Sequence, residues 1–382
     1  MLAVIAKFYY LCPITRPRAD PARDFAPTIH PDIMELSAQN IEALRRLLET
    51  PQRRIVILSH TNPDGDAIGS SIAWAESLRR AGHTVACIVP NKYPYYLDWM
   101  SGIRDVVIFK TDSEGRAARA VEEADLIFCL DFHSLSRLDA LSELIAANAS
   151  AKRILIDHHL NPTEPFDLMF SHPESSSTSY LVYRLIERLW GAGTVTRAQA
   201  EVLYVGMMTD TGNFAFSSLT PGLFRAVAVL VERGIHVPTL YNNVYNAYTE
   251  GRARLFGYAI NRKMQLIEDG TVAYMSLMEN EMRRFRFQQG DSEGFVNYAL
   301  TIKKMKMSAM FLAHRKFIRV SLRSRGDVDV NLFARRYFGG GGHKNAAGGK
   351  SFVSMEETIA HYIRSVREFA EEGYLGDAKS EK

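Results

Sequence analysis

Three apolar, strand-like runs of this chain end in residues that bind metals. The runs are 54–58, followed by His60, Asp64 and Asp66; 126–130, followed by Asp131; and 153–156, followed by Asp157, His158 and His159. The carboxyl ends of parallel strands meet at one edge of a sheet, so these side chains would converge there. Carboxylates and imidazoles are common ligands of divalent metals. The pattern therefore predicts a sheet with a binuclear metal site at its edge.

Helical segments alternate with these strands. Ile68, Ile72, Ala75 and Leu78 recur on one helical face, and Gly82 follows where a helix commonly ends. The remaining segments fit the same rhythm, with a helix near 41–48 and strands at 54–58, 84–89, 106–109, 126–130 and 153–156. This alternation predicts an α/β fold, with a mainly parallel sheet that carries helices on both faces.

The second half of the chain has a different pattern. A helical stretch at 221–248, expected to break at Gly234 and Pro238, precedes shorter strands such as 271–277 and 317–322. This indicates a smaller α+β domain, and 382 residues exceed the roughly 100 to 200 of one domain. The expected divisions are a disordered N-terminal extension (1–33), a first domain (34–240), a connector (241–256), a second domain (257–376) and a tail (377–382).

Composition excludes several classes of protein. Hydrophobic residues make up 47% of the chain and charged residues 23%, which argues against disorder. No segment has the roughly 20 uninterrupted apolar residues that cross a bilayer, so no membrane partner is expected. A net charge of +3 is too small for a protein that coats nucleic acid. Three cysteines without paired spacing indicate a reducing, cytoplasmic location.

Two later segments can add to the metal-binding edge. Residues 175–179 are four serines and a threonine that open a helix, where hydroxyl and N–H groups can hold an anion or only cap the helix. Residues 207–212 place Asp210 in an expected turn. So many carboxylates in one place would repel each other unless cations were bound between them.

The order of these motifs resembles the DHH family of phosphoesterases, which is named after a triplet like 157–159. Residues 59–70 are similar to the first family motif, Asp131 to the second and 209–212 to the fourth. Residues 321–324 and the glycine-rich segment 338–348 resemble the DHHA1 substrate-binding domain. The resemblance extends from about Met34 to about Phe369. It implies a DHH domain followed by a DHHA1 domain.

The resemblance also implies a role for each site residue. His60, Asp64 and Asp131 would hold one metal ion, and Asp66, Asp131, His158 and Asp210 would hold the other. Asp131 would bridge the two ions, Asp157 would orient its neighbours, and His159 would contact the substrate phosphate or the leaving oxygen. Two such ions activate water and offset phosphoryl charge. Manganese suits this ligand set best, with magnesium, cobalt and iron left open.

The second domain would supply recognition of the substrate. The expected contacts with the substrate phosphate, besides His159, are Arg323, Ser324, Gly341, Gly342 and His343. The glycines would let backbone N–H groups approach a phosphate closely. Phe214 and Phe216 could stack a base beside the metals, although packing in the core is an equal alternative.

Within the family, the length is most similar to enzymes that degrade short oligoribonucleotides such as pApA and remove the 3′-phosphate of adenosine 3′,5′-bisphosphate. Three other phosphoesterase activities stay open, namely those of a cyclic di-AMP phosphodiesterase, a RecJ-like single-strand exonuclease and a family II pyrophosphatase. A nucleotide-binding regulator is the alternative without catalysis. A homodimer is also left open.

Overall fold

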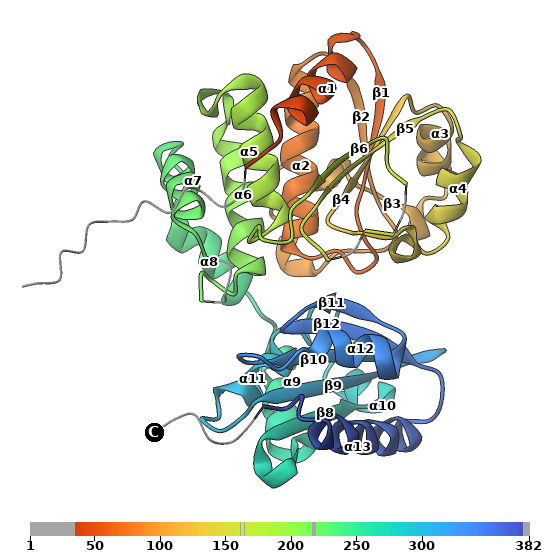
Figure 1. Ribbon diagram of the computed structural model, residues 1–382, viewed down its shortest axis with the longest axis vertical. Helices are drawn as coiled ribbons and strands as arrows, with labels where there is room; N and C mark the ends of the chain where they lie inside the picture. Colours follow the sequence, from red (N-terminus) through yellow and green to blue (C-terminus); the bar gives the residue numbers. More distant parts are fainter. Residues whose placement is uncertain (1–34, 161, 164, 216–218, 377–382) are drawn as a thin grey trace, which may run out of the picture.

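The computed structural model describes residues 35–160, 162–163, 165–215 and 219–376, which form two domains stacked end to end (Figure 1). The expected extension at 1–33, the tail at 377–382 and Phe216 lie outside the described residues. Within the described part, no helix is long and apolar enough to cross a membrane.

The first domain contains a six-stranded sheet in which all neighbouring strands are parallel. The order is β3-β2-β1-β4-β5-β6. Chain order therefore reverses between β1 and β4, and in such sheets ligands bind where the order reverses, beyond the carboxyl ends of the strands. The strands are β1 (Arg54–Leu58), β2 (Thr84–Val89), β3 (Val107–Ile108), β4 (Leu126–Leu130), β5 (Lys152–Asp157) and β6 (Leu168–Ser171).

Helices cover both faces of this sheet (Figure 1). Ile55 and Ile57 of β1 point into a core shared with α2, α5 and α6, while Val56 and Leu58 point into a core with α3 and α4. Side chains that alternate between two buried faces explain why these strands read as unbroken apolar runs. The helices of this domain are α1 (Ala38–Glu49), α2 (Gly65–Arg80), α3 (Arg116–Glu122), α4 (Leu141–Ala147), α5 (Thr178–Trp190), α6 (Arg197–Asp210), α7 (Pro221–Glu232) and α8 (Val237–Tyr245).

The second domain is built on a mixed sheet with the order β11-β12-β10-β9-β8-β7, in which only β8 and β9 pair in parallel. Its strands are β7 (Gln265–Ile267), β8 (Val272–Leu277), β9 (Met307–His314), β10 (Phe317–Ser324), β11 (Gly341–His343) and β12 (Ala346–Ser351). Its helices are α9 (Glu250–Tyr258), α10 (Glu279–Arg284), α11 (Phe295–Tyr298), α12 (Val330–Phe338) and α13 (Met355–Glu371).

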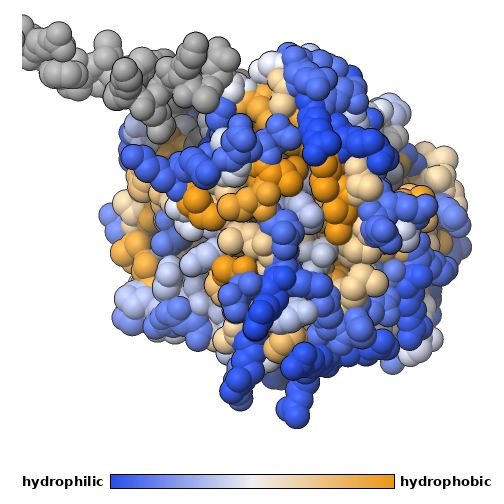
Figure 2. Space-filling model, turned by 90° about the horizontal axis from the view of Figure 1, so that it is seen from below, coloured by the Kyte–Doolittle hydropathy of each residue, from blue (hydrophilic) through white to orange (hydrophobic). Residues whose placement is uncertain are grey.

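The two faces of the second sheet are covered differently. Ile318, Val320 and Leu322 pack against α12 and α13, whereas Met310 and Leu312 on the opposite face pack against α9 and α11. Of the strands in this sheet, β11 and β12 lie nearest the first domain (Figure 1). The end of the molecule that points away from the first domain carries a band of apolar side chains among hydrophilic ones (Figure 2).

The predicted fold class is confirmed, and two local predictions need correction. Asp210 was expected in a turn but is the last residue of α6, where the helix holds its side chain more firmly than a loop would. Pro238 was expected to break a helix but lies in the first turn of α8, where its missing N–H group costs no hydrogen bond. The predicted connector, 241–256, begins inside α8 and ends inside α9.

Candidate metal centre

The loop between β1 and α2 places two metal-binding side chains. The Nδ1–H group of His60 donates to the carbonyl oxygen of Thr61 at 2.9 Å, which leaves Nε2 free to bind a metal. Asp64 caps α2, because its Oδ1 atom accepts the N–H groups of Asp66 and Ala67 at 2.9 and 3.1 Å. The same side chain thus begins the helix and presents its second oxygen to the site.

Asp66, in the first turn of α2, is buried and fixed by another helix. Its two carboxylate oxygens accept the backbone N–H groups of Thr178 and Ser179 at 2.7 and 2.8 Å. Ser177 caps this helix, α5, by accepting the N–H group of Tyr180. The hydroxyl-rich run at 175–179 was expected to hold an anion or to cap its helix. It does both, and the anion is the protein's own Asp66.

Glycines let the helices approach closely at this point. A Cβ atom on Gly206 of α6 would lie 1.9 Å from Oγ of Ser179 and 2.9 Å from Oδ1 of Asp66. A Cβ atom on Gly69 of α2 would lie 2.4 Å from the carbonyl oxygen of Val202. Larger residues at either position would force α2, α5 and α6 apart and move Asp66.

Asp131 follows β4 and lies between the two groups of expected ligands. Its Oδ2 atom is 3.3 Å from Nε2 of His60, and its Oδ1 atom is 3.5 Å from Nε2 of His158. The hydroxyl of Thr178 donates to Oδ1 at 3.0 Å. The backbone of Asp131 has a φ of 64°, which is uncommon for a residue with a side chain and is typical of functional positions.

His158 completes the second group. Its Nδ1–H group donates to the carbonyl oxygen of Ser175 at 3.2 Å, so Nε2 faces the carboxylates. Nε2 lies 3.4 Å from Oδ2 of Asp210 and 4.0 Å from Oδ2 of Asp66. Among the described residues, four sets of donor atoms lie close enough to share an ion. Two of them belong to the expected ligands, His60 with Asp64 and Asp131, and Asp66 with His158 and Asp210. The other two contain His159, with His158 and His343 in one and with His133 and Asp157 in the other.

The charges at this site favour a bound cation. Burial and the carboxylates of Asp131 and Asp210 raise the pKa of Asp66 well above its usual value. The pKa of Asp210 rises to about 6, mainly through burial. Burial opposes the protonation of His158, but the surrounding carboxylates outweigh it and raise the pKa of His158 well above 6.5. Without a metal, a proton on His158 offsets part of the negative charge of these carboxylates. A divalent cation bound between them would neutralise the same charge, so the donor set fits divalent metal ions.

Asp157 and His159 form a pair beside these ligands. The Nδ1–H group of His159 donates to Oδ1 of Asp157 at 2.7 Å, which orients the ring. Burial raises the pKa of Asp157, but the charge and hydrogen bond of His159 outweigh it, so the pKa falls below its usual value. The sequence reasoning missed His133, whose ring centroid lies 5.6 Å from that of His159. Its position two residues after Asp131 was the available signal.

His343 of the second domain lies next to the candidate metal ligands of the first domain. Its ring centroid is 4.6 Å from that of His158 and 4.6 Å from that of His159. Burial, followed by these two histidines, lowers the pKa of His343 to about 2, so the ring is neutral. Arg323 is close enough to Asp210 and Asp64 to interact electrostatically with their carboxylates. Both residues therefore lie near the expected ligands, and their contact with a substrate stays a prediction.

The glycine run has a packing role within the second domain. Gly339 ends α12 with a φ of 55°, and a Cβ atom on Gly340 would lie 1.8 Å from the carbonyl oxygen of Gly348. The N–H group of Gly340 donates to Ala334, and that of Gly342 donates to Oδ1 of Asn331. These two N–H groups therefore have partners inside the domain, and the glycines allow close packing of the chain.

Two other residues for which substrate contacts were considered have partners within the protein. The hydroxyl of Ser324 donates to the carbonyl oxygen of Val328 at 2.6 Å and accepts a bond from Asn345, inside the second domain. The ring of Phe214 packs at the edge of the core, with its centroid 5.7 Å from that of Tyr204.

A loop at 288–294 joins the second domain to the metal-binding loop. Gln289 donates its side-chain amide to Oδ1 of Asn62 at 3.2 Å, and the hydroxyl of Tyr96 donates to the carboxyl of Glu293. Burial raises the pKa of Glu293 to about 8, and the charge of Asp64 adds to this effect. These contacts place a neutral carboxyl group between the two domains at neutral pH.

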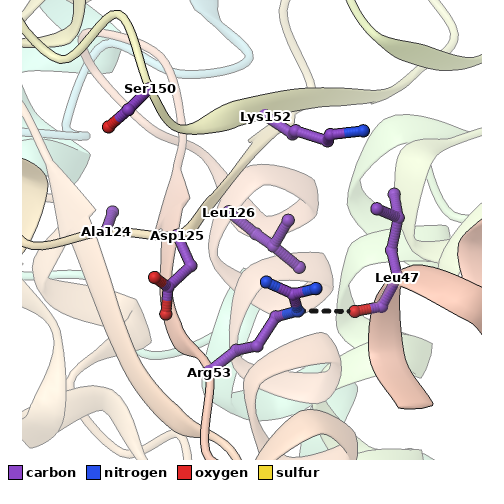
Figure 3. A pocket seen from close by; sticks show the side chains of 7 residues that line it. All are labelled: Leu47, Arg53, Ala124, Asp125, Leu126, Ser150 and Lys152. Carbon is purple, nitrogen blue, oxygen red and sulfur yellow. Dashed lines mark hydrogen bonds between the residues drawn. The ribbon is translucent and has the colours of Figure 1, made fainter. Parts of the chain in front are cut away.

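A separate hollow of about 310 Å³ lies at the opposite edge of the first sheet (Figure 3). It is lined by Leu47, Arg53, Ala124, Asp125, Leu126, Ser150 and Lys152. These residues precede or begin β1, β4 and β5, whereas the candidate metal ligands other than Asp210 follow the same strands. The hollow is therefore not part of the candidate metal centre.

Comparisons with known proteins agree with this architecture. The family model described as "DHH family, N-terminal domain" matches residues 54–207, and the family model described as "DHHA1 domain" matches residues 269–372. An exopolyphosphatase-related protein from Bacteroides fragilis, solved by crystallography, is 38% identical and superposes with a TM-score of 0.82, covering 89% of this chain and 98% of that one.

Two curated relatives carry functional names. The bifunctional oligoribonuclease and PAP phosphatase NrnA of Thermus thermophilus is 25% identical over 342 residues, which are 88% of this chain and 97% of that protein. The cyclic-di-AMP phosphodiesterase GdpP of Bacillus subtilis is 26% identical over 350 residues, which are 87% of this chain but 50% of that protein. The matched part of this chain therefore spans nearly all of the NrnA protein but only half of GdpP.

Proposed function

The chain belongs to the DHH family of phosphoesterases, and on that premise we propose that it hydrolyses short oligoribonucleotides to mononucleotides and adenosine 3′,5′-bisphosphate to AMP. The observation that carries this proposal is the position of Asp131, whose two oxygens face different histidine-containing ligand groups. A carboxylate placed in this way fits a pair of ions better than a single ion.

Two divalent cations, for which manganese fits the oxygen and imidazole donors, would supply Lewis acidity that activates water and offsets phosphoryl charge. His60, Asp64 and Asp131 would hold one ion. The ligands of the other would be Asp66, Asp131, His158 and Asp210. Thr178 would keep Asp131 in place through its hydroxyl group, and the start of α5 would keep Asp66 in place.

His159 is the residue proposed to act on the leaving group. Asp157 holds its Nδ1–H group, so Nε2 is available to hydrogen-bond the substrate phosphate or to donate a proton to the departing ribose oxygen. The lowered pKa of Asp157 favours its ionised form, which accepts the hydrogen bond from His159. Arg323 and His343 would hold the substrate from the second domain.

Relatives of this chain are named for both activities, so cleavage of cyclic di-AMP is the alternative that an assay must separate. Cys87 and Cys129 are buried cysteines, which fit the reducing cytoplasm, and this is the location that we propose.

A product assay with manganese tests the proposal. The substrates are pApA, a five-nucleotide RNA, a long single strand, cyclic di-AMP and adenosine 3′,5′-bisphosphate, and Asp131→Asn is the control for contaminating nucleases. We expect the two short RNAs and the bisphosphate to be hydrolysed at least about 10-fold faster than the other two substrates. Equal rates on the long strand would favour a RecJ-like exonuclease, and a preference for cyclic di-AMP would favour the phosphodiesterase.

A further inference from the structure

The face of the second sheet that carries Arg323 and His343 presents polar side chains in regular rows. Side chains of residues paired across strands lie on the same face, and successive rows are roughly 7 Å apart. The row nearest the metal centre pairs Arg323 with Ala346 and Ala346 with His343. The next row pairs Ser321 with Gly348 and Gly348 with Gly341, so its floor has almost no side chains.

A second basic row follows. Arg319 pairs with Lys350, two rows beyond Arg323, and Phe317 lies in the row after that. The Nζ atom of Lys350 is 5.1 Å from the centroid of the Phe317 ring, and the ring of His314 stacks on Phe317 at 5.0 Å. From the metal edge outward, the face thus has a basic row, a bare row, a second basic row and an aromatic platform.

The side chain of Arg319 does not make all the hydrogen bonds that it can donate. One of its terminal nitrogens donates to Oγ of Ser292 at 3.0 Å, while its Nε–H group is buried and has no hydrogen-bond partner among the described residues. Arginine donors that lack partners are typical of a site that awaits an anion. The acidic group close enough to interact electrostatically with Arg319 is Glu293. Because the pKa of Glu293 is raised to about 8, its carboxyl group is neutral near neutral pH.

We propose that Arg319 and Lys350 form a second phosphate subsite, which holds a phosphate of an oligonucleotide farther from the metal centre than the one at Arg323 and His343. The bare row between them leaves room for the sugar-phosphate chain, and Phe317 offers a ring on which an outer base stacks. This inference rests on the proposed function and deepens it, because the subsite recognises substrates of several nucleotides and lies beyond the reach of a mononucleotide.

The test compares substrates of different length. kcat and KM are measured for adenosine 3′,5′-bisphosphate, pApA and a five-nucleotide RNA with the wild type, Arg319→Gln and Lys350→Gln. The control is Arg315→Gln, which removes a charge from the exposed turn of the same hairpin. We expect both variants to lose about 10-fold in kcat/KM on the five-nucleotide RNA, through KM, and to change by less than about twofold on the bisphosphate.

An equal loss on all three substrates, or a loss of the same size in Arg315→Gln, would overturn the subsite while leaving the proposed function intact. A wild type that hydrolyses none of the three would overturn both. Lys350 is exposed, so Lys350→Gln keeps the test valid if Arg319→Gln loosens the contact with Ser292 and lowers the melting temperature.

Discussion

The carboxylate of Asp66 accepts the backbone N–H group of Thr178 at 2.7 Å across a sequence separation of 112 residues. The hydroxyl of the same threonine donates to Asp131 at 3.0 Å. One residue at the start of α5 therefore fixes a carboxylate from each of the two strand ends that flank the reversal in strand order. Hydrogen bonds of this kind orient metal ligands and raise the affinity for the ion.

Thr178→Val should lower the affinity for manganese about 10-fold, because Asp131 loses its hydroxyl donor while the backbone bond to Asp66 remains. Calorimetric titration of the metal-free protein measures this. Ser177→Ala is the matched control, since it removes only the helix cap and should lower stability by about 1 kcal/mol without changing metal affinity. Equal losses of affinity in both variants would show that Thr178 acts only through the helix.

Asp210→Asn should stabilise the metal-free protein near neutral pH and abolish activity. The pKa of Asp210 is raised from 3.8 to about 6, mainly by burial, so the folded state becomes less stable as pH rises through this range and this carboxyl ionises. The variant should melt roughly 2 to 6 °C higher than the wild type at about pH 7 and show a smaller difference at about pH 4.5. A difference that does not change with pH would contradict this assignment.

Glu293→Gln should change how substrate binding depends on pH. The wild-type carboxyl, with a pKa raised to about 8 by burial and by Asp64, is neutral below that pH and charged above it. Its charge would then compete with the substrate for Arg319 and Arg323. KM for pApA should therefore rise above about pH 8 in the wild type more than in the variant, in steady-state assays at matched manganese. The same rise in both proteins would exclude Glu293 as the cause.

His343→Ala and Arg323→Ala should raise KM for pApA by about 10-fold or more and leave the number of bound metal ions unchanged. Arg325→Ala, which removes an exposed charge next to the same strand, is the control for general electrostatic effects. The contact of His343 with both His158 and His159 makes the metal count the decisive readout. If His343→Ala lost an ion, His343 would itself be a ligand.

The metal edge was predictable because strands end in the same sense in a parallel sheet. That rule brought His60, Asp131 and His158 together from their positions alone. The role of Thr178 was not predictable, since it depends on how α5 packs against α2, with Gly206 providing the space. Hydrophobic periodicity identifies a helix but does not show which carboxylate its first N–H groups will meet.

The second domain was harder to predict for a related reason. The pairing of Arg319 with Lys350 depends on strand register, which is set by long-range contacts and not by local sequence. Local sequence therefore does not show that Lys350 lies beside Arg319 and over the ring of Phe317. The glycines at 339–342 were interpreted as part of a substrate-binding segment. The structure shows that position 340 also needs a glycine for packing, because Gly348 lies too close for a side chain to fit.

The most direct test of the account is the number of manganese ions bound by the wild type and by Asp131→Asn, measured together with hydrolysis of pApA. Asparagine keeps the size of the side chain but lacks the second anionic oxygen, so it cannot serve two ions equally. We predict two ions in the wild type, at most one in the variant, and a loss of activity of at least about 100-fold with an unchanged circular dichroism spectrum. Two bound ions and near-normal turnover in Asp131→Asn at saturating manganese would contradict the account.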